Sequence, residues 1–192
     1  MILGITGGTG CGKTTVLEVI RELGGTVLDC DAIYHRLLER SPQLLEDIEN
    51  RFPGVVTEGK LDRKKLGERV FSDPNALLDL NRIAHGAVKQ EVLRLLAPKP
   101  ELAAIDAIAL FEGGLAELCD YTIAVTAPKE ARLLRLMARD GITEEYALAR
   151  INAQKTAEQF REMTDFSLEN DGTQAEFESK TKVLLQQLLG NK

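Results

Sequence analysis

The stretch GITGGTGCGKTT, at residues 4–15, decides the fold. Its segment GGTGCGKT, residues 7–14, satisfies in full the phosphate-binding pattern G-x-x-x-x-G-K followed by Ser or Thr. A short apolar run at residues 1–6 precedes it, which is typical of a buried strand. A helical stripe follows, formed by Val16, Val19, Ile20 and Leu23. Because a strand precedes the motif and a helix follows it, we expect a nucleoside triphosphate site rather than a chance match in a glycine-rich turn.

The residue types of this loop, the P-loop, suit phosphate binding. Glycines allow successive backbone N–H groups to turn toward one anion, and the following helix adds its positive end. Lys13 would supply charge to the β- and γ-phosphates, and the Thr14 hydroxyl would coordinate Mg²⁺. We therefore predict ATP and Mg²⁺ as ligands. The expected nucleotide-binding residues are Gly8, Gly10, Cys11, Gly12, Lys13, Thr14 and Thr15.

Four further short apolar runs predict strands, at residues 26–30, 102–111, 121–126 and, more weakly, 166–169. Helical patterns lie between them, at residues 31–40, 62–71, 74–98, 129–139 and 143–155, and Thr173 with Glu176 opens a last helix. Residues 53–60, rich in Gly and Pro, read as a loop. Alternating strands and helices predict a three-layer α/β fold of the P-loop NTPase type, with a five-stranded parallel sheet in a single domain, residues 1–192.

Composition limits the function classes. The net charge of -6 and pI near 5.1 argue against a general nucleic-acid binder, which needs clustered positive charge. The 3 cysteines form no CxxC pair, so neither a disulfide framework nor a zinc site is predicted. No signal peptide or membrane span is recognisable. We expect a cytoplasmic protein with small-molecule partners, and the sequence leaves open a monomer or a small homo-oligomer.

The end of the second expected strand carries the candidate for acceptor chemistry. Asp29, Cys30 and Asp31 follow one another there, where carboxyl ends of parallel strands line a ligand crevice. A carboxylate at Asp31 could orient an acceptor hydroxyl and take its proton. Capping of the next helix by Asp31 is an equally open interpretation.

The motifs along the chain resemble those of the dephospho-CoA kinase family. Besides the P-loop they are DCDAIYH at 29–35, LDR at 61–63, VFSD at 70–73, LNRIAH at 80–85, LFEGGL at 110–115, CD at 119–120, RLMARDGITEEYALARINAQ at 135–154 and NDGT at 170–173. The resemblance spans nearly the whole chain. It implies ATP-dependent phosphorylation of the ribose 3′-hydroxyl of dephospho-CoA, the last step of coenzyme A biosynthesis.

The resemblance also implies an organisation and site residues. It implies a helical acceptor-binding region at about 31–97 and a mobile helical lid at about 129–160. Carried over by position, Asp31 faces the acceptor ribose as the base, and Arg139 reaches the transferred phosphate from the lid, with Lys13 completing the catalytic set. The residues that would line the acceptor side are Thr6, Asp31, Arg63 and His85.

Several assignments carry alternatives. Arg132 and Arg135 share a helical face with Arg139, and we interpret both as a solvated basic surface. Glu112, expected at a strand end, could contact a ligand or act as a structural cap. Cys11, where the family usually has serine, could be a redox sensor or simply a small replacement.

Two other functions remain open at this point. One is a nucleoside or nucleotide kinase on the same core, which would differ in the acceptor pocket only. The other is a nucleotide-binding regulatory protein without phosphotransfer. A GTPase is disfavoured, because the sequence holds neither an N-K-x-D nor a D-x-x-G motif.

Overall fold

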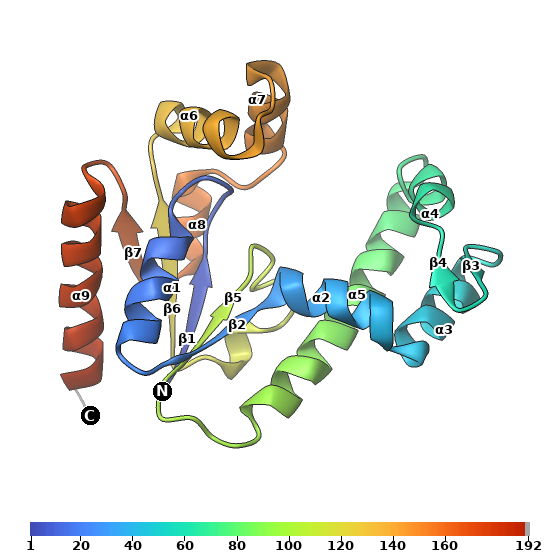
Figure 1. The fold of residues 1–192 in the computed structure, drawn as a ribbon, viewed down its shortest axis with the longest axis horizontal. Helices are drawn as coiled ribbons and strands as arrows, with labels where there is room; N and C mark the ends of the chain where they lie inside the picture. The colour runs from blue at the N-terminus through green and yellow to red at the C-terminus, as the bar shows by residue number, and fades with distance from the viewer. Residues whose placement is uncertain (191–192) are drawn as a thin grey trace. The chain divides into compact units, whose positions relative to one another are not determined.

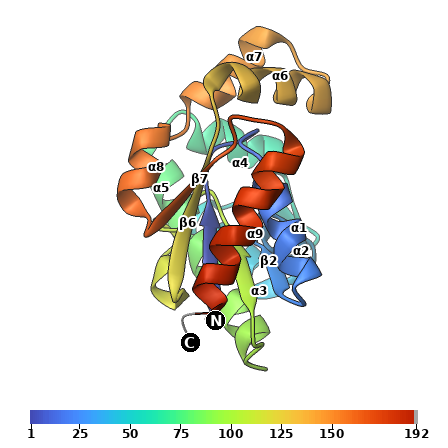
Figure 2. The same cartoon turned by 90° about the vertical axis from the view of Figure 1, so that its left-hand side faces the viewer.

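The computed structural model describes residues 1–190, and part of this chain forms a five-stranded parallel sheet flanked by helices (Figures 1 and 2). The strands are β1 (Ile2–Thr6), β2 (Thr26–Asp29), β5 (Ala103–Asp106), β6 (Tyr121–Thr126) and β7 (Phe166–Glu169), in the order β2-β5-β1-β6-β7. Strand β1 lies at the centre and pairs in parallel with β5 and β6, and β6 pairs in parallel with β7. The predicted five-stranded parallel sheet is confirmed.

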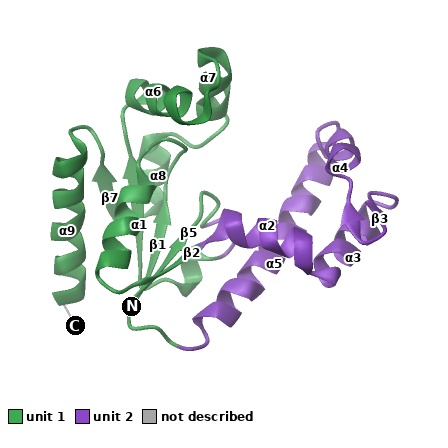
Figure 3. Ribbon diagram, in the orientation of Figure 1, with its two compact units in different colours: residues 1–28, 99–110, 115–192 green, residues 29–98, 111–114 purple. Residues whose placement is uncertain are grey.

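The chain divides into two compact units (Figure 3). Unit 1 comprises Met1–Leu28, Lys99–Leu110 and the chain from Leu115 onward, and unit 2 comprises Asp29–Pro98 and Phe111–Gly114. The residues that we expect to bind the acceptor, apart from Thr6, lie in unit 2.

Unit 1 holds the sheet and the P-loop. Helix α1 (Lys13–Glu22) packs against β5 and against α9 (Gln174–Gly190), while α8 (Ala157–Met163) packs on β6 from the other face (Figure 2). The core between sheet and helices includes Leu3, Ile5, Ile20, Ile123 and Phe177, all essentially without exposed surface. A short 3-10 turn, η1 (Ala116–Leu118), precedes β6. The three-layer arrangement predicted from the alternating pattern is therefore present.

The segment of unit 1 that is predicted to be a lid contains a helical hairpin. Helix α6 (Lys129–Asp140) is followed by α7 (Glu144–Asn152), and the two pack together through Leu136, Ala147 and Ile151. Gly141 closes α6 in the left-handed conformation, and the Thr143 hydroxyl caps α7.

Unit 2 is mostly helical. It contains α2 (Cys30–Arg40), α3 (Pro42–Arg51), the two-residue strands β3 (Val56–Thr57) and β4 (Lys60–Leu61), α4 (Arg63–Val70) and α5 (Pro74–Leu96). Its core includes Leu44, Ile48, Phe52, Val55 and Leu66. Asp62 and Asp73 cap α4 and α5.

Two expectations about the elements are wrong, and two helices were not predicted. Residues 53–60 are not a plain loop, because Val56–Thr57 pairs antiparallel with Lys60–Leu61. The strand expected at residues 102–111 ends at Asp106, and beyond it Ala107 and Leu110 are buried outside any strand. Helices α3 and α8 were not predicted as separate elements.

No helix within residues 1–190 combines the length and apolar character that a membrane span needs.

Candidate active site

The P-loop joins β1 to α1 and has the backbone of a phosphate cradle. Gly7 and Gly12 have φ of 138° and 102°, a region that side chains with a Cβ rarely adopt. A Cβ on Gly7 would also collide with the carbonyl oxygen of Val125 on β6. The loop conformation therefore depends on the glycines that the motif prescribes.

Lys13, the first residue of α1, points back along the loop. Its Nζ donates to the Gly7 carbonyl at 3.3 Å and lies 3.9 Å from Asp106 Oδ1. Both side chains are mostly buried, with exposed fractions of 15% and 17%. Thr14, next along α1, is exposed and available to a ligand.

Asp106 was missed as a site residue at the level of sequence. It ends β5, the neighbour of β1, so its carboxylate lies at the edge of the sheet where the P-loop begins. Its place at the carboxyl end of a strand, where α/β sheets bind ligands, would have indicated a site, but the strand was expected to continue to residue 111. In P-loop proteins an aspartate of this kind holds Mg²⁺ together with the loop hydroxyl.

The donor set fits Mg²⁺ better than a metal that needs a protein cage. Mg²⁺ takes oxygen ligands and is usually held by one or two carboxylates, substrate phosphates and water. The Thr14 hydroxyl and the Asp106 carboxylate are donors of this type. Within the described residues no group of three or more His, Cys, Asp or Glu side chains is arranged to hold a metal.

Cys11 is part of the core rather than of the loop's exposed surface. Its side chain is 1% exposed and packs in the same cluster as Val16 and Phe177. Burial raises the pKa of its thiol, although the nearby charges of Lys13 and Arg132 act in the opposite direction. A redox-sensing thiol needs a low pKa and access to solvent, so the redox interpretation is not supported.

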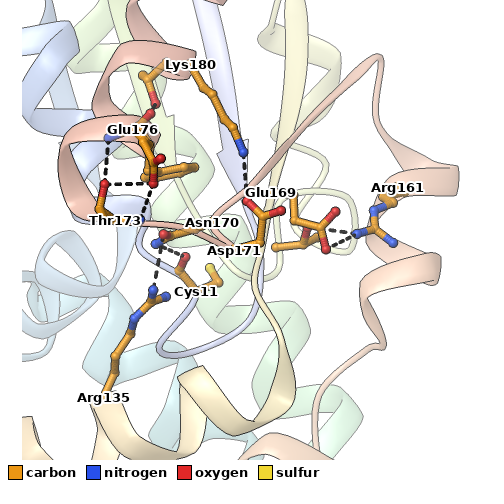
Figure 4. A network of polar contacts seen from close by, with 12 residues as sticks. Cys11, Arg135, Arg161, Glu169, Asn170, Asp171, Thr173, Glu176 and Lys180 are labelled. Atoms are coloured by element: carbon orange, nitrogen blue, oxygen red, sulfur yellow. Dashed lines mark hydrogen bonds and ion pairs between the residues drawn. The ribbon is translucent and has the colours of Figure 1, made fainter.

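The backbone carbonyls of the P-loop are bound from outside by side chains of α6 and of the turn after β7. Arg132 Nε donates to Thr9 O at 2.8 Å, and Arg135 Nη1 donates to Gly10 O at 3.3 Å. Asn170 Nδ2 donates to Cys11 O at 3.0 Å, and its Oδ1 accepts from Arg135 at 3.2 Å (Figure 4).

The interpretation of Arg132 and Arg135 as a solvated surface is therefore wrong. Arg132 is only 7% exposed. Helical spacing identified the face that these arginines share, but it could not show that this face meets the P-loop.

Arg139 is exposed in the last turn of α6. Its Nε and Nη2 donate to the two carboxylate oxygens of Asp140 at 2.6 and 2.9 Å, and Arg150 donates to the same carboxylate at 2.7 Å. The hydrogen bond from Arg139, followed by that from Arg150, lowers the pKa of Asp140 to about 2. Contact of Arg139 with a transferred phosphate stays a prediction.

In unit 2, Asp29 and Asp31 have different roles. Asp29 caps α2, because its Oδ1 accepts from Ala32 N at 2.9 Å. Asp31 is exposed in the first turn of α2, and within residues 1–190 its carboxylate accepts no hydrogen bond. The capping interpretation of Asp31 is thus wrong, and its carboxylate is available to a substrate.

Arg63 and His85 are the remaining acceptor-side candidates of unit 2. Burial raises the pKa of Tyr34 on α2, and the charge of Arg63 acts in the opposite direction. Arg63 itself is exposed at the start of α4. His85 is half-buried on α5, and burial lowers its pKa, so the imidazole is mainly neutral near pH 7.

Two further residues, Thr6 and Glu112, lie in or beside the chain that follows β5. Thr6 has no exposed surface, and its hydroxyl donates to Ile108 O at 3.1 Å, so it orders the chain after β5. Direct contact of Thr6 with an acceptor stays a prediction. Glu112 does not end a strand, because β5 ends at Asp106; it is exposed in the turn at Phe111–Gly114.

The fold and the site define a P-loop nucleotide-binding protein. The defining features are a central parallel strand, a glycine loop, a lysine at the following helix and a strand-end aspartate. The family model for dephospho-CoA kinase matches residues 1–176. A dephospho-CoA kinase from Deinococcus radiodurans is 41% identical over 97% of this chain and 91% of its own length, and one from Thermus thermophilus is 39% identical over 99% and 93%. The chain therefore belongs to the dephospho-CoA kinase family.

Solved structures agree with this assignment. The structure of TT1252 from Thermus thermophilus aligns with a TM-score of 0.81 at 37% identity, over 98% of this chain and 97% of that one. Dephospho-CoA kinase from Campylobacter jejuni aligns with a TM-score of 0.69 at 30% identity, over 100% and 98%. Shikimate kinase from Bacteroides thetaiotaomicron, at 17% identity and a TM-score of 0.58, shares the fold.

Proposed function

We propose that this chain transfers the γ-phosphoryl group of ATP to the ribose 3′-hydroxyl of dephospho-CoA, giving coenzyme A and ADP. One observation carries the proposal: a complete P-loop, with Lys13 beside Asp106, in a chain that matches the dephospho-CoA kinase family over residues 1–176. The 3′-oxygen forms a bond to the γ-phosphorus, the bond to the β-γ bridging oxygen breaks, and the hydroxyl proton passes to a base.

On the donor side, we assign binding to the P-loop. Backbone N–H groups of the loop bind the phosphate oxygens, and Lys13 adds positive charge at the β- and γ-phosphates. Thr14 and Asp106 would hold Mg²⁺, which offsets the charge that develops on the phosphate oxygens. Phosphoryl transfer depends mainly on positioning and electrostatic stabilisation, which these groups supply.

On the acceptor side, we assign the base to Asp31. Its carboxylate is exposed and makes no hydrogen bond within residues 1–190, so it can accept one from the 3′-hydroxyl. Arg63 supplies a cation to the anionic acceptor, and the neutral imidazole of His85 can donate or accept a hydrogen bond. These residues constitute the acceptor-binding region at about 31–97.

The lid at about 129–160 would exclude water during transfer. Arg139 leaves Asp140 and binds the transferred phosphoryl group when the lid closes. The exchange is favourable only if the doubly charged phosphoryl oxygens attract the guanidinium more strongly than Asp140 does.

The remaining assignments concern binding partners, cellular location and oligomeric state. The binding partners are ATP and dephospho-CoA, without nucleic acid, in the cytoplasm. The chain acts as a monomer or small homo-oligomer, which sedimentation at assay concentration would decide.

An ADP-release assay over several acceptors tests the proposed function. With ATP and Mg²⁺, dephospho-CoA should give the highest kcat/KM, above adenosine and AMP, and NMR should place the new phosphate on the 3′-oxygen. Adenosine offers the same hydroxyl but lacks the pyrophosphate and pantetheine arm, whose binding aligns the reacting atoms. Equal turnover of AMP would favour a nucleotide kinase, and ATP binding without ADP release would favour a regulatory protein.

A further inference from the structure

The hydrogen bonds on the outer side of the P-loop form a connected set. Both ends of the α6–α7 hairpin meet at one loop residue, Thr9. Arg132, near the start of α6, donates to Thr9 O at 2.8 Å. Gln154, just after α7, accepts from Thr9 N at 2.8 Å and from Arg132 Nη2 at 3.0 Å through one oxygen, Oε1.

Asn170 completes the set at the next peptide groups along the loop. Its amide donates to Cys11 O, and Arg135 links its Oδ1 to Gly10 O. In Figure 4, dashed lines join Asn170, in the turn between β7 and α9, to both Cys11 and Arg135. We name Arg132, Arg135, Gln154 and Asn170 the carbonyl clamp. Three of them donate to loop carbonyls, and Gln154 accepts from the Thr9 N–H and supports Arg132.

Because peptide groups are planar, the clamp also sets the direction of N–H groups inside the loop. In a trans peptide the C=O of one residue and the N–H of the next point in opposite directions. A clamp that holds Thr9 O and Cys11 O outward therefore turns the N–H groups of Gly10 and Gly12 to the opposite side. That side is where a phosphate cradle needs its donors.

Two glycines of the loop show how closely the clamp fits. A Cβ on Gly8 would collide with the Arg132 guanidinium and lie 3.0 Å from Gln154 Oε1. A Cβ on Gly12 would collide with the Asn170 amide. The glycines at both positions thus make room for the clamp, and Gly12 also permits the positive φ of the loop.

We propose that Arg132, Gln154 and Asn170 are positioning residues that fix the phosphate-binding conformation of the P-loop from its outer side. They act through Thr9 and Cys11 and touch no reacting atom, and Arg135 supports them by linking Asn170 to Gly10 O. Because Arg132 and Gln154 lie at opposite ends of the lid hairpin, the base of the lid is attached to the same loop. This inference goes beyond the proposed transfer reaction and does not depend on the acceptor.

The first variant to test is Gln154→Met, which keeps the length of the side chain and removes the acceptor oxygen. The probes are ATP and inorganic tripolyphosphate, each with Mg²⁺, measured by calorimetry. Loss of the shared acceptor leaves Thr9 N–H unsatisfied, so both affinities should fall by about tenfold. The factor should be the same for the two ligands, because tripolyphosphate contacts only the phosphate cradle.

A matched control is Gln159→Met. Gln159 Oε1 also accepts a backbone hydrogen bond, from Thr156 N at 2.9 Å, but at the start of α8. It should leave both affinities unchanged. A second variant, Asn170→Leu, removes the donor to Cys11 O and should reproduce the loss for both ligands if Gln154→Met does not fold.

The kinetic pattern separates positioning from general loss of structure. In steady state the two clamp variants should raise KM for ATP while KM for dephospho-CoA stays at the wild-type value. Unchanged tripolyphosphate affinity in folded Gln154→Met or Asn170→Leu would overturn the proposal. So would a loss confined to ATP, because it would place the side chains at the nucleoside rather than at the phosphates.

Discussion

Two neighbouring aspartates in unit 2 allow a direct separation of stability from chemistry. Asp29 caps α2 through its bond to Ala32 N, whereas Asp31 is exposed and its carboxylate is without a hydrogen bond in the described chain, residues 1–190. The substitutions Asp29→Ala and Asp31→Asn should therefore have opposite signatures. The first should lower stability and keep kcat, and the second should keep stability and lower kcat.

The magnitudes follow from the contacts. Loss of an N-cap costs about 1 kcal/mol, which lowers Tm by roughly 2–4 °C in a chain of this size. Asp31→Asn only neutralises a charge in the first turn of α2, at a cost of about 0.3 kcal/mol in salt. A general base contributes on the order of 10²–10⁴ to the rate, so kcat of Asp31→Asn should fall at least about a hundredfold.

The assay pairs thermal unfolding with ADP release at saturating ATP and dephospho-CoA, and calorimetry reports ATP affinity. Asp62→Ala is the control for loss of a cap, because Asp62 accepts from Lys64 N and Lys65 N at the start of α4. If Asp31→Asn turned over normally, or if Asp29→Ala lost kcat at unchanged Tm, the assignment of the base would be refuted.

Three more predictions follow from the site. Lys13→Ala should reduce transfer at least about a hundredfold with an unchanged circular dichroism spectrum, because Lys13 faces the phosphates; a rate near wild type would contradict the loop assignment. Alkylation of Cys11 near pH 8 should be far slower in the native protein than in urea, because the thiol is 1% exposed and its pKa is raised. Peptide mapping by mass spectrometry measures the rate, and rapid modification of the native protein would contradict the prediction. An NMR titration should find Asp140 with a pKa of about 2, below the ordinary 3.8, so its contribution to stability is present above pH 3.8 and lost as pH falls toward 2; an ordinary midpoint would show that Arg139 and Arg150 do not hold this carboxylate in solution.

Periodicity was sufficient to predict elements whose burial follows a simple pattern. The strands at residues 121–126 and 166–169 have the bounds that their apolar runs indicate. The apolar run at residues 102–111 gave a strand that is too long, because Ala107 and Leu110 are buried in irregular chain, and burial alone does not distinguish such chain from a strand. Helix α3 did have a readable start: Ser41 accepts from Leu44 N and Pro42 occupies the first turn.

The site was predictable where its residues are close in sequence. The P-loop is one continuous motif, and glycine chemistry explains each of its turns. The clamp joins residues far apart: Arg132 lies 123 positions after Thr9, and Asn170 lies 159 positions after Cys11. Sequence spacing identified a face of α6, but only the packing of unit 1 shows what that face contacts.

Charge shows the same difference between composition and arrangement. A net charge of -6 would repel a triphosphate if it were spread evenly. Lys13, Arg132 and Arg135 are instead gathered around one short loop, and the charges of Lys13 and Arg132 both act to lower the pKa of Cys11. Their positive field therefore reaches the loop itself, where it adds to the N–H groups that the clamp directs inward. Affinity for a polyanion in this acidic chain thus depends on local geometry, so substitutions that disturb the clamp at constant net charge should weaken phosphate binding more than the removal of distant surface cations.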